Sequence, residues 1–415
     1  MTAGDQAPPA QETADQSPGV TTLEIFFDLV FAFTLTQLTA LLASQLSWAA
    51  AGRVLLVFGL LWWMYGAYAW LTNSRPPVHT AERLLLLVGM AGFLVIGLAI
   101  PRGFGSYGVV LGLGYLLVVI VHAVLYYRVN PNIIRVAPFN IASALLVTGA
   151  GLLHGPSGAT SLAGYVLWVA ALAVQLGSPL IVHPAGLFEL RPSHFSERHN
   201  ALVIVAIGES VAAVGIGAAG PASRAGPVSW HLLASAVLGL AVGAALWWMV
   251  FGAGDEERSE QALAAAPADR RSVLALSAYF YGLIPLLLGL IALAAGILRA
   301  VVLAASPQVT PALGIRADQA TVLAVGAALF LGGNANLRRQ LHTGPVRLRA
   351  MAAAAALATI PVGIFAGLNA QLILVAAVLV APLVAERGPD ASDGRREIAA
   401  GGPATDGSGA DDGAG

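Results

Sequence analysis

The stretch LEIFFDLVFAF, residues 23–33, opens the first long apolar run of the chain. It has the composition of a membrane helix, yet it places Glu24 and Asp28 among phenylalanines. An ionised carboxylate near the centre of a bilayer costs roughly 3 kcal/mol on insertion scales. These two residues therefore predict a first helix that is surrounded by other helices and not simply exposed to lipid.

The composition of the whole chain is typical of an integral membrane protein. Of its 415 residues, 57% are hydrophobic and 10% are charged, whereas soluble domains carry roughly 25% charged residues. A net charge of −1 without a basic cluster excludes nucleic acid as a partner. The chain has no cysteine, and it lacks Walker, GxSxG and dinucleotide-binding motifs, so we expect no cofactor and no enzyme of those classes.

Hydropathy predicts an all-α fold, a polytopic transmembrane bundle of twelve helices. Runs of about 17–25 apolar residues, long enough to cross the hydrocarbon layer, alternate with short polar loops. One hairpin near the C-terminus could instead be re-entrant, because the tenth run and the last two are short or closely linked. The predicted spans are 23–44, 50–72, 83–100, 106–128, 134–153, 162–182, 198–218, 231–252, 273–298, 320–335, 349–367 and 370–385.

The arginines predict the orientation of this bundle. All 21 basic residues are arginine, and 16 of them flank the side of the membrane that holds both chain ends. Cytoplasmic loops accumulate basic residues, so we expect both termini to be cytoplasmic. The opposite side holds five arginines, which are Arg53, Arg102, Arg224, Arg299 and Arg316.

The helices divide evenly into two groups of six. Residues 21–182 form the first predicted half, residues 183–197 a cytoplasmic loop, and residues 198–385 the second half. Six helices return the chain to the same side, so an internal repeat would be parallel and helices one and seven would correspond. Residues 1–20 lack the basic segment of a signal peptide. Together with residues 386–415 they are predicted to be disordered tails.

Three acidic residues in the apolar runs differ in depth. Glu24 and Asp28 lie about 40° apart around the helix and share one face. We interpret Glu24 as an interfacial residue that caps the helix. Asp28 is deeper, and Glu209 in the motif AIGES is predicted near the midplane. For these two, binding of a proton or cation and a structural hydrogen-bonded role both remain open.

Other polar residues extend this set of candidates. Thr36 lies near the Asp28 face, and Gln37 is on the opposite side of the helix. His122 can exchange protons near neutral pH and could partner one of the acids. Ser210 follows Glu209 and is assigned a structural role.

The motif SHFSERH at the start of the seventh helix suggests a metal site but has the wrong spacing. It fits neither HExxH nor HxxEH, so we expect no metal there. Glu197 and Arg198 are interpreted as interfacial residues, and Ser196 as the N-cap of the helix.

Two motifs together, LEIFFDLVFAFTLTQL (23–38) and SERHNALVIVAIGES (196–210), resemble the low temperature requirement protein A (LtrA) family. In this bacterial family the first helix carries E-x-F-F-D-L-V-F and then Gln, and a later helix carries E-R followed by G-E-S. The resemblance spans about residues 20–385. It implies a multi-pass inner-membrane protein linked to growth in the cold, without a settled biochemical activity. After Glu197-Arg198 the chain has His199-Asn200 where the family more often continues with apolar residues.

FFDLVFAFTLTQL is also similar to the F-S-D-x-V-F-A signature of a potassium-channel family built from six-helix repeats. In that family the signature helix lines the pore. Here Phe27 stands in place of the serine.

Three functional hypotheses remain open from the sequence. The first is passage of a small solute or ion, linked to protons or cations, with Asp28 and Glu209 as binding groups. The second is an accessory membrane protein in cold or envelope stress, in which the acids only hold helices together. The third is an intramembrane enzyme that acts on lipid with His122 or the loop histidines as base. The lipid bilayer is the one partner common to all three, and the oligomeric state stays open.

Overall fold

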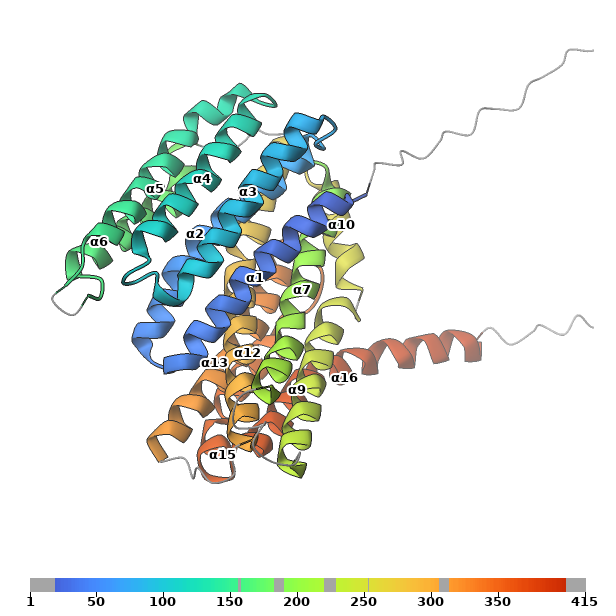
Figure 1. Cartoon of the computed structure of the whole chain (residues 1–415). Helices are drawn as coiled ribbons and strands as arrows, with labels where there is room; N and C mark the ends of the chain where they lie inside the picture. The colour runs from blue at the N-terminus through green and yellow to red at the C-terminus, as the bar shows by residue number, and fades with distance from the viewer. Residues whose placement is uncertain are drawn as a thin grey trace, which may run out of the picture.

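The chain folds into a bundle of helices in which the described residues form no β-strand (Figure 1). Eleven helices are long and apolar enough to cross a membrane, and α5 is a shorter apolar helix. The predicted polytopic all-α bundle is therefore confirmed. The computed structural model describes residues 19–155, 158–182, 190–219, 229–252, 254–305 and 313–400.

Each predicted span has a helical counterpart. The first half contains α1 (Thr22–Gln45), α2 (Trp48–Ser74), α3 (Thr80–Ala99), α4 (Gly108–Tyr127), α5 (Ala137–Leu152) and α6 (Leu162–Val182). The second half contains α7 (Pro192–Ala218), α9 (Trp230–Phe251), α12 (Leu283–Ala305), α13 (Leu313–Leu341), α14 (Arg347–Leu357), α15 (Ile360–Phe365) and α16 (Leu368–Ala400). The short helices are η1 (Ile100–Arg102), η2 (Pro131–Arg135), α10 (Asp255–Ala265), α11 (Ala268–Ala275) and η3 (Leu276–Tyr281).

Two boundaries differ from the predicted ones. The helix α7 begins at Pro192, inside the predicted 183–197 loop, because proline suits the first helical turn and the following residues are buried. Ser196 is therefore not an N-cap, and its hydroxyl lies 3.0 Å from that of Tyr279. The helix α16 continues to Ala400, past the predicted end at residue 385. Residues 1–18, 183–189 and 401–415 lie outside the described part of the chain.

The segment before α12 contains one π-helical turn, η3. The Gly282 amide donates to the Ser277 carbonyl, five residues earlier, at 3.0 Å. The Phe280 carbonyl accepts instead from the indole N–H of Trp62 on α2, at 2.7 Å. Such turns re-aim side chains and are frequent at functional sites.

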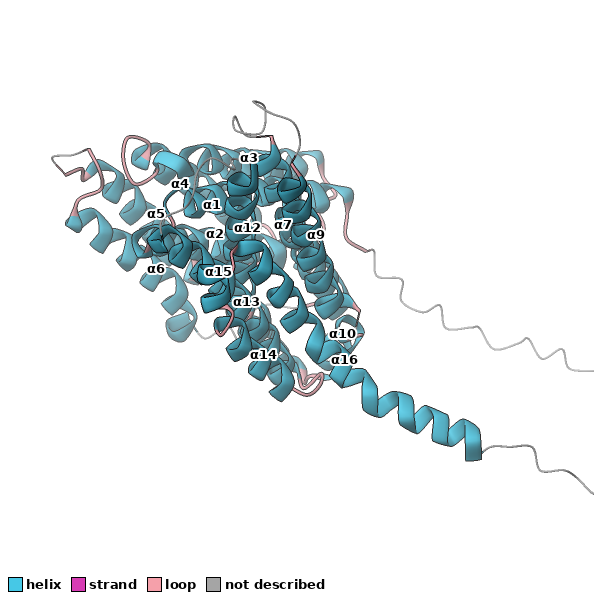
Figure 2. Ribbon diagram, turned by 90° about the horizontal axis from the view of Figure 1, so that it is seen from below, coloured by secondary structure: helices cyan, strands magenta, loops and turns pink. Residues whose placement is uncertain are grey.

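The same order of packing recurs in the two halves. In the first half α1 packs on α2 and α3, then α3 to α6 pack in series, and α6 returns to α2. In the second half α7 packs on α9 and α12, α12 packs on α13, α13 on α14, α14 on α16, and α16 returns to α9. The halves meet where α1 and α2 face α7 and α12. Figure 2 shows these four helices between α5 on one side and α9 on the other.

Candidate functional site

A buried ion-pair cluster lies where α1, α2 and α7 meet, close to the beginning of α1. We call this end of the bundle the arginine-rich end, because Arg75 and Arg128 lie in its turns and Arg83 lies in the first turn of α3. Thr21 starts α1 with a capping box: its backbone N–H donates to Glu24 Oε2 at 2.9 Å, and its hydroxyl accepts from the Glu24 amide. The cap turns the Glu24 side chain toward α7.

Arg198 of α7 bridges both carboxylates of α1. Its Nη1 donates to Glu24 Oε1 at 2.7 Å and to the Thr72 hydroxyl at 2.6 Å. Its Nη2 donates to Asp28 Oδ1 at 3.2 Å, and that oxygen also accepts from the Tyr65 hydroxyl at 2.9 Å. The side chains of Glu24, Asp28 and Arg198 are at most 1% exposed. Such pairs are strongly destabilised when one partner is removed, because the other charge stays buried.

A clamp of hydrogen bonds fixes the start of α7 against the end of α2. The Arg191 amide donates to Asn73 Oδ1 at 2.9 Å, and Asn73 Nδ2 donates to the Arg191 carbonyl at 2.8 Å. One turn further, His194 Nε2 lies 3.3 Å from Glu24 Oε2. The clamp therefore sets the register that brings both His194 and Arg198 to the carboxylates.

Aromatic rings enclose the cluster. The Arg198 guanidinium carbon lies 5.5 Å from the ring centre of Phe27 and 5.8 Å from that of Tyr65, within the range of cation–π attraction. Two carboxylates face one guanidinium, and Asp28 Oδ2 has no hydrogen-bond partner among the described residues. Glu24 and Asp28 together carry one negative charge more than Arg198 balances. Burying that excess charge is costly, so this site favours a proton or cation that compensates it.

Glu209 occupies a separate place further along the contact between α1 and α7. The Thr36 hydroxyl donates to Glu209 Oε1 at 2.8 Å, and the Glu209 side chain is 7% exposed. Within the described residues no arginine or histidine forms a salt bridge with it. Glu209 lies about 16 Å along α7 from Arg198. It is a carboxylate deep in the bundle with a hydroxyl as its neighbour.

Asp28 and Glu209, the two deeper acids, do not contact each other. Thr36, the partner of Glu209, lies about 12 Å further along α1 than Asp28. The structure pairs Asp28 with Arg198, which was expected only as an interfacial residue. Glu24 takes part in the capping box of α1 and is in addition fully buried in an ion pair.

The remaining candidates of these two helices lie at the edges of the site. Glu197 is exposed and accepts from the Val20 amide at 3.4 Å. The Ser210 hydroxyl donates to the Ile207 carbonyl at 2.7 Å and faces Gly243 of α9. Gln37 is half-buried on the other side of α1.

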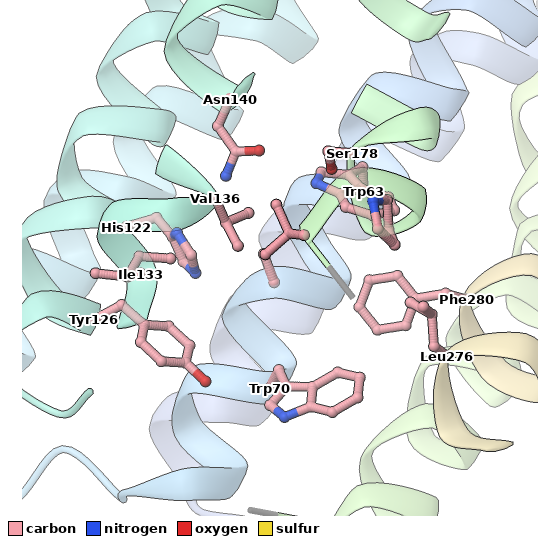
Figure 3. Close-up of a pocket in the computed structure, with 13 residues that line it drawn as sticks. Trp63, Trp70, His122, Tyr126, Ile133, Val136, Asn140, Ser178, Leu276 and Phe280 are labelled. Carbon is pink, nitrogen blue, oxygen red and sulfur yellow. The ribbon is translucent and has the colours of Figure 1, made fainter. Parts of the chain in front are cut away.

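His122 is not part of this site. It lies on α4 between Tyr68 and Tyr126, with ring centres 5.2 and 5.4 Å away, and pairs with no carboxylate within the described ranges. The pairing with one of the acids that the sequence left open is thus not seen among the described residues. It lines an apolar cavity with Asn140 and Ser178 (Figure 3). The part of the chain that the structure describes holds no group of three or more His, Asp or Glu side chains arranged for a metal.

The pairing of Arg198 with Glu24 and Asp28 was not predicted from the sequence. Arg198 lies at the start of the apolar run of α7, as Glu24 and Asp28 lie at the start of the apolar run of α1. The charge of Arg198 is opposite to that of the two carboxylates, and each is unfavourable in its own apolar run. That complementarity was the available signal. The contributions of Tyr65 and Thr72 had none, because aromatic and hydroxyl residues are common along α2.

Comparisons with known proteins cover most of this bundle. A sequence profile described as "Bacterial low temperature requirement A protein (LtrA)" matches residues 19–385, which include every residue of the cluster. An uncharacterized protein of Rhizobium meliloti (strain 1021) is 25% identical to this chain over 284 residues. The alignment covers 66% of this chain and 67% of that protein.

Proposed function

We propose that this chain, a member of the bacterial low temperature requirement A (LtrA) family, conducts or carries a small cation or a proton. Its bundle of apolar helices is that of a multi-pass membrane protein. The pathway runs along the contact between α1 and α7. In this proposal Glu209 binds the ion, and the cluster of Glu24, Asp28 and Arg198 closes the pathway at the arginine-rich end.

The observation that carries the proposal is that Glu209 is buried without a salt-bridge partner among the described residues. A carboxylate held deep in a bundle needs a compensating charge, yet its neighbour is the neutral hydroxyl of Thr36. A proton or a cation supplies that compensation, and its exchange constitutes a step of transport. The residue is thus a functional candidate on physical grounds, independent of the family.

A crevice between the halves supports access from the opposite end. It has a volume of about 450 Å³ and is lined by α1, α2, α12 and α13. Leu42 on its wall lies about 9 Å along α1 from Thr36. Asp318 is the acidic residue of its lining and gives the crevice a negative charge that attracts cations.

The proposed orientation places the arginine-rich end in the cytoplasm of the bacterial inner membrane. Basic residues concentrate in the turns at this end, as cytoplasmic loops require. Transport then depends on the Arg198 cluster opening toward the cytoplasm. A second candidate function follows from the same cluster: a non-transporting accessory protein, favoured by the full pairing of Arg198 with Glu24.

Flux measurements separate these two candidates. The purified protein is reconstituted in liposomes, and H⁺, K⁺ and Na⁺ fluxes are followed with ion-sensitive dyes. Glu209→Gln removes the charge and keeps the shape, so we expect it to lower the flux by about tenfold or more, the scale of one charged hydrogen bond. Glu197→Gln, an exposed carboxylate of the same helix, is the matched control and keeps the flux.

Two outcomes would contradict transport. The first is a wild-type protein that passes none of the three ions. The second is a flux that Glu209→Gln leaves unchanged while the variant is folded, as judged by its elution volume and unfolding temperature. Either result favours the accessory function.

A further inference from the structure

The two halves contain the same close helix crossing. A Cβ at Gly92 of α3 would lie 3.3 Å from the Gly114 carbonyl oxygen of α4. A Cβ at Gly289 of α12 would lie 2.7 Å from the Gly326 carbonyl oxygen of α13. A Cβ at Gly92 would in addition lie 2.7 Å from Val118 Cγ2, and one at Gly289 would meet the Phe330 amide nitrogen. Small residues therefore suit both crossings.

A second close approach extends the correspondence. A Cβ at Gly151 of α5 would meet the Gly108 backbone of α4, and one at Gly363 of α15 would meet Ala320 of α13. Gly363 follows Gly151 by 212 positions, and Ala320 follows Gly108 by the same number. Gly326 also follows Gly114 by 212 positions. This common spacing aligns α4 with α13 residue by residue.

The buried faces of α4 and α13 agree with this alignment. The aligned buried pairs include Leu111 with Leu323, Tyr115 with Ala327, Val118 with Phe330, Val119 with Leu331, His122 with Asn334, and Tyr126 with Arg338. The first four pairs form the apolar core. The last two lie toward the arginine-rich end, where the halves differ in chemistry.

In the second half this position is filled by ion pairs and hydrogen bonds, which we call the Asp255 network; its members are Asp255, Asn334, Arg338, Arg349 and Glu386. Arg338 Nε and Nη2 donate to the two carboxylate oxygens of Asp255 at 2.7 and 2.9 Å, and its Nη1 donates to Glu386 at 3.0 Å. Arg349 donates to Asp255 at 3.0 Å, to Glu386 at 3.2 Å, and to the Asn334 side chain. Arg258 also donates to Asp255 at 2.6 Å from the exposed side. The space is thus filled by paired charges.

In the first half the same position is a cavity of about 90 Å³. Its walls are the rings of Trp63, Trp70, Tyr126 and Phe280 with aliphatic side chains, and no charged residue lines it. Figure 3 shows the His122 ring and the Asn140 amide directed toward the other residues that line this cavity. His122 is 2% exposed. Its ring nitrogens have no partner at hydrogen-bond geometry among the described residues, and the Ala67 backbone lies close enough to interact with the ring.

We propose that this cavity is a binding site for a small neutral molecule with a flat apolar ring and one hydrogen-bonding group. The aromatic walls take the ring, and the ring nitrogens of His122 take the polar group. The volume of about 90 Å³ matches roughly three waters at the ~30 Å³ that each occupies in the liquid, which limits the ligand to a small ring system and excludes a whole lipid chain. The equivalent site of the second half is closed by the Asp255 network and binds nothing. This inference does not depend on the transport proposal.

Indole and indene test the site, because they have the same shape and only indole can hydrogen bond through nitrogen. Binding to the full-length protein in lipid nanodiscs is measured by calorimetry, with empty nanodiscs as the background. We expect saturable binding of indole. His122→Phe should lower the affinity for indole by about tenfold, because one buried hydrogen bond is lost. The affinity for indene should stay nearly unchanged.

Cavity filling provides the second arm. Val136→Trp places a ring in the cavity and should abolish binding of both ligands. The matched control is Leu348→Trp, the aligned position of the second half, which should bind indole like the wild type. Ala67→Leu is the alternative filling variant if Val136→Trp fails to fold.

The proposal is wrong if indole shows no saturable binding, or if both folded filling variants bind it like the wild type. It is also wrong if Leu348→Trp abolishes binding as fully as Val136→Trp does. An unchanged indole affinity in His122→Phe would contradict the assigned ligand class.

Discussion

Arg198 contacts both carboxylates of α1 and the Thr72 hydroxyl inside a shell of aromatic rings. Replacement by alanine leaves Glu24 and Asp28 buried without a cation. We expect Arg198→Ala to destabilise the protein by about 3–5 kcal/mol, the usual cost of breaking a buried pair from one side. The measurement is the thermal unfolding midpoint of the detergent-solubilised protein.

The triple variant Glu24→Gln, Asp28→Asn, Arg198→Ala is the control for this effect, because it removes the charges together. It should be more stable than Arg198→Ala alone. If the triple variant is the less stable of the two, the carboxylates do not depend on Arg198 for their compensation.

At the scale of the helix, α12 and α13 cross through glycines, among them Gly289, Gly326 and Gly333. A methyl group at Gly289 would lie 2.7 Å from the Gly326 carbonyl oxygen, and backbone atoms cannot move aside alone. Gly289→Ala should therefore cost about 1–3 kcal/mol through overpacking. Gly332 of α13 has open space at the Cβ position, so Gly332→Ala should be neutral or slightly stabilising. Equal unfolding midpoints for the two variants would contradict this assignment.

The helices themselves could be predicted from sequence, and their polar contacts largely could not. Membrane thickness fixes the length of an apolar run, so the twelve spans follow from hydropathy alone. Asp28 was found in the same way, because its charge conflicts with its surroundings. Its partner lies 170 residues away in the chain, and no local pattern records that distance. The start of α7 was placed too late, because buried His194 and Ser196 have the composition of a loop.

At the scale of the whole molecule, the Asp255 network joins the ends of several helices of the second half. Glu386 of α16 accepts hydrogen bonds from both Arg338 and Arg349. Glu386→Ala should lower the stability by about 1.5–3 kcal/mol, the range for hydrogen bonds to charged groups. Thermal unfolding in detergent measures the effect.

Deletion of residues 387–415 is the matched control, since it keeps Glu386. The last turns of α16 project away from the bundle (Figure 1), so the deletion should leave the unfolding midpoint unchanged. If the deletion lowers the unfolding midpoint and Glu386→Ala leaves it unchanged, the stabilising contact lies in residues 387–415 and not at Glu386.

The pairing of α1 with α7 also has a consequence for biosynthesis. Glu24 and Asp28 emerge from the ribosome 174 and 170 residues before Arg198. At about 5–20 residues per second, the interval is roughly 10–30 s. During that time the first helix holds two acids without their cation, and an isolated position in lipid is unfavourable for it. The newly made α1 must therefore stay protonated, or wait beside the insertion machinery, until the seventh helix arrives.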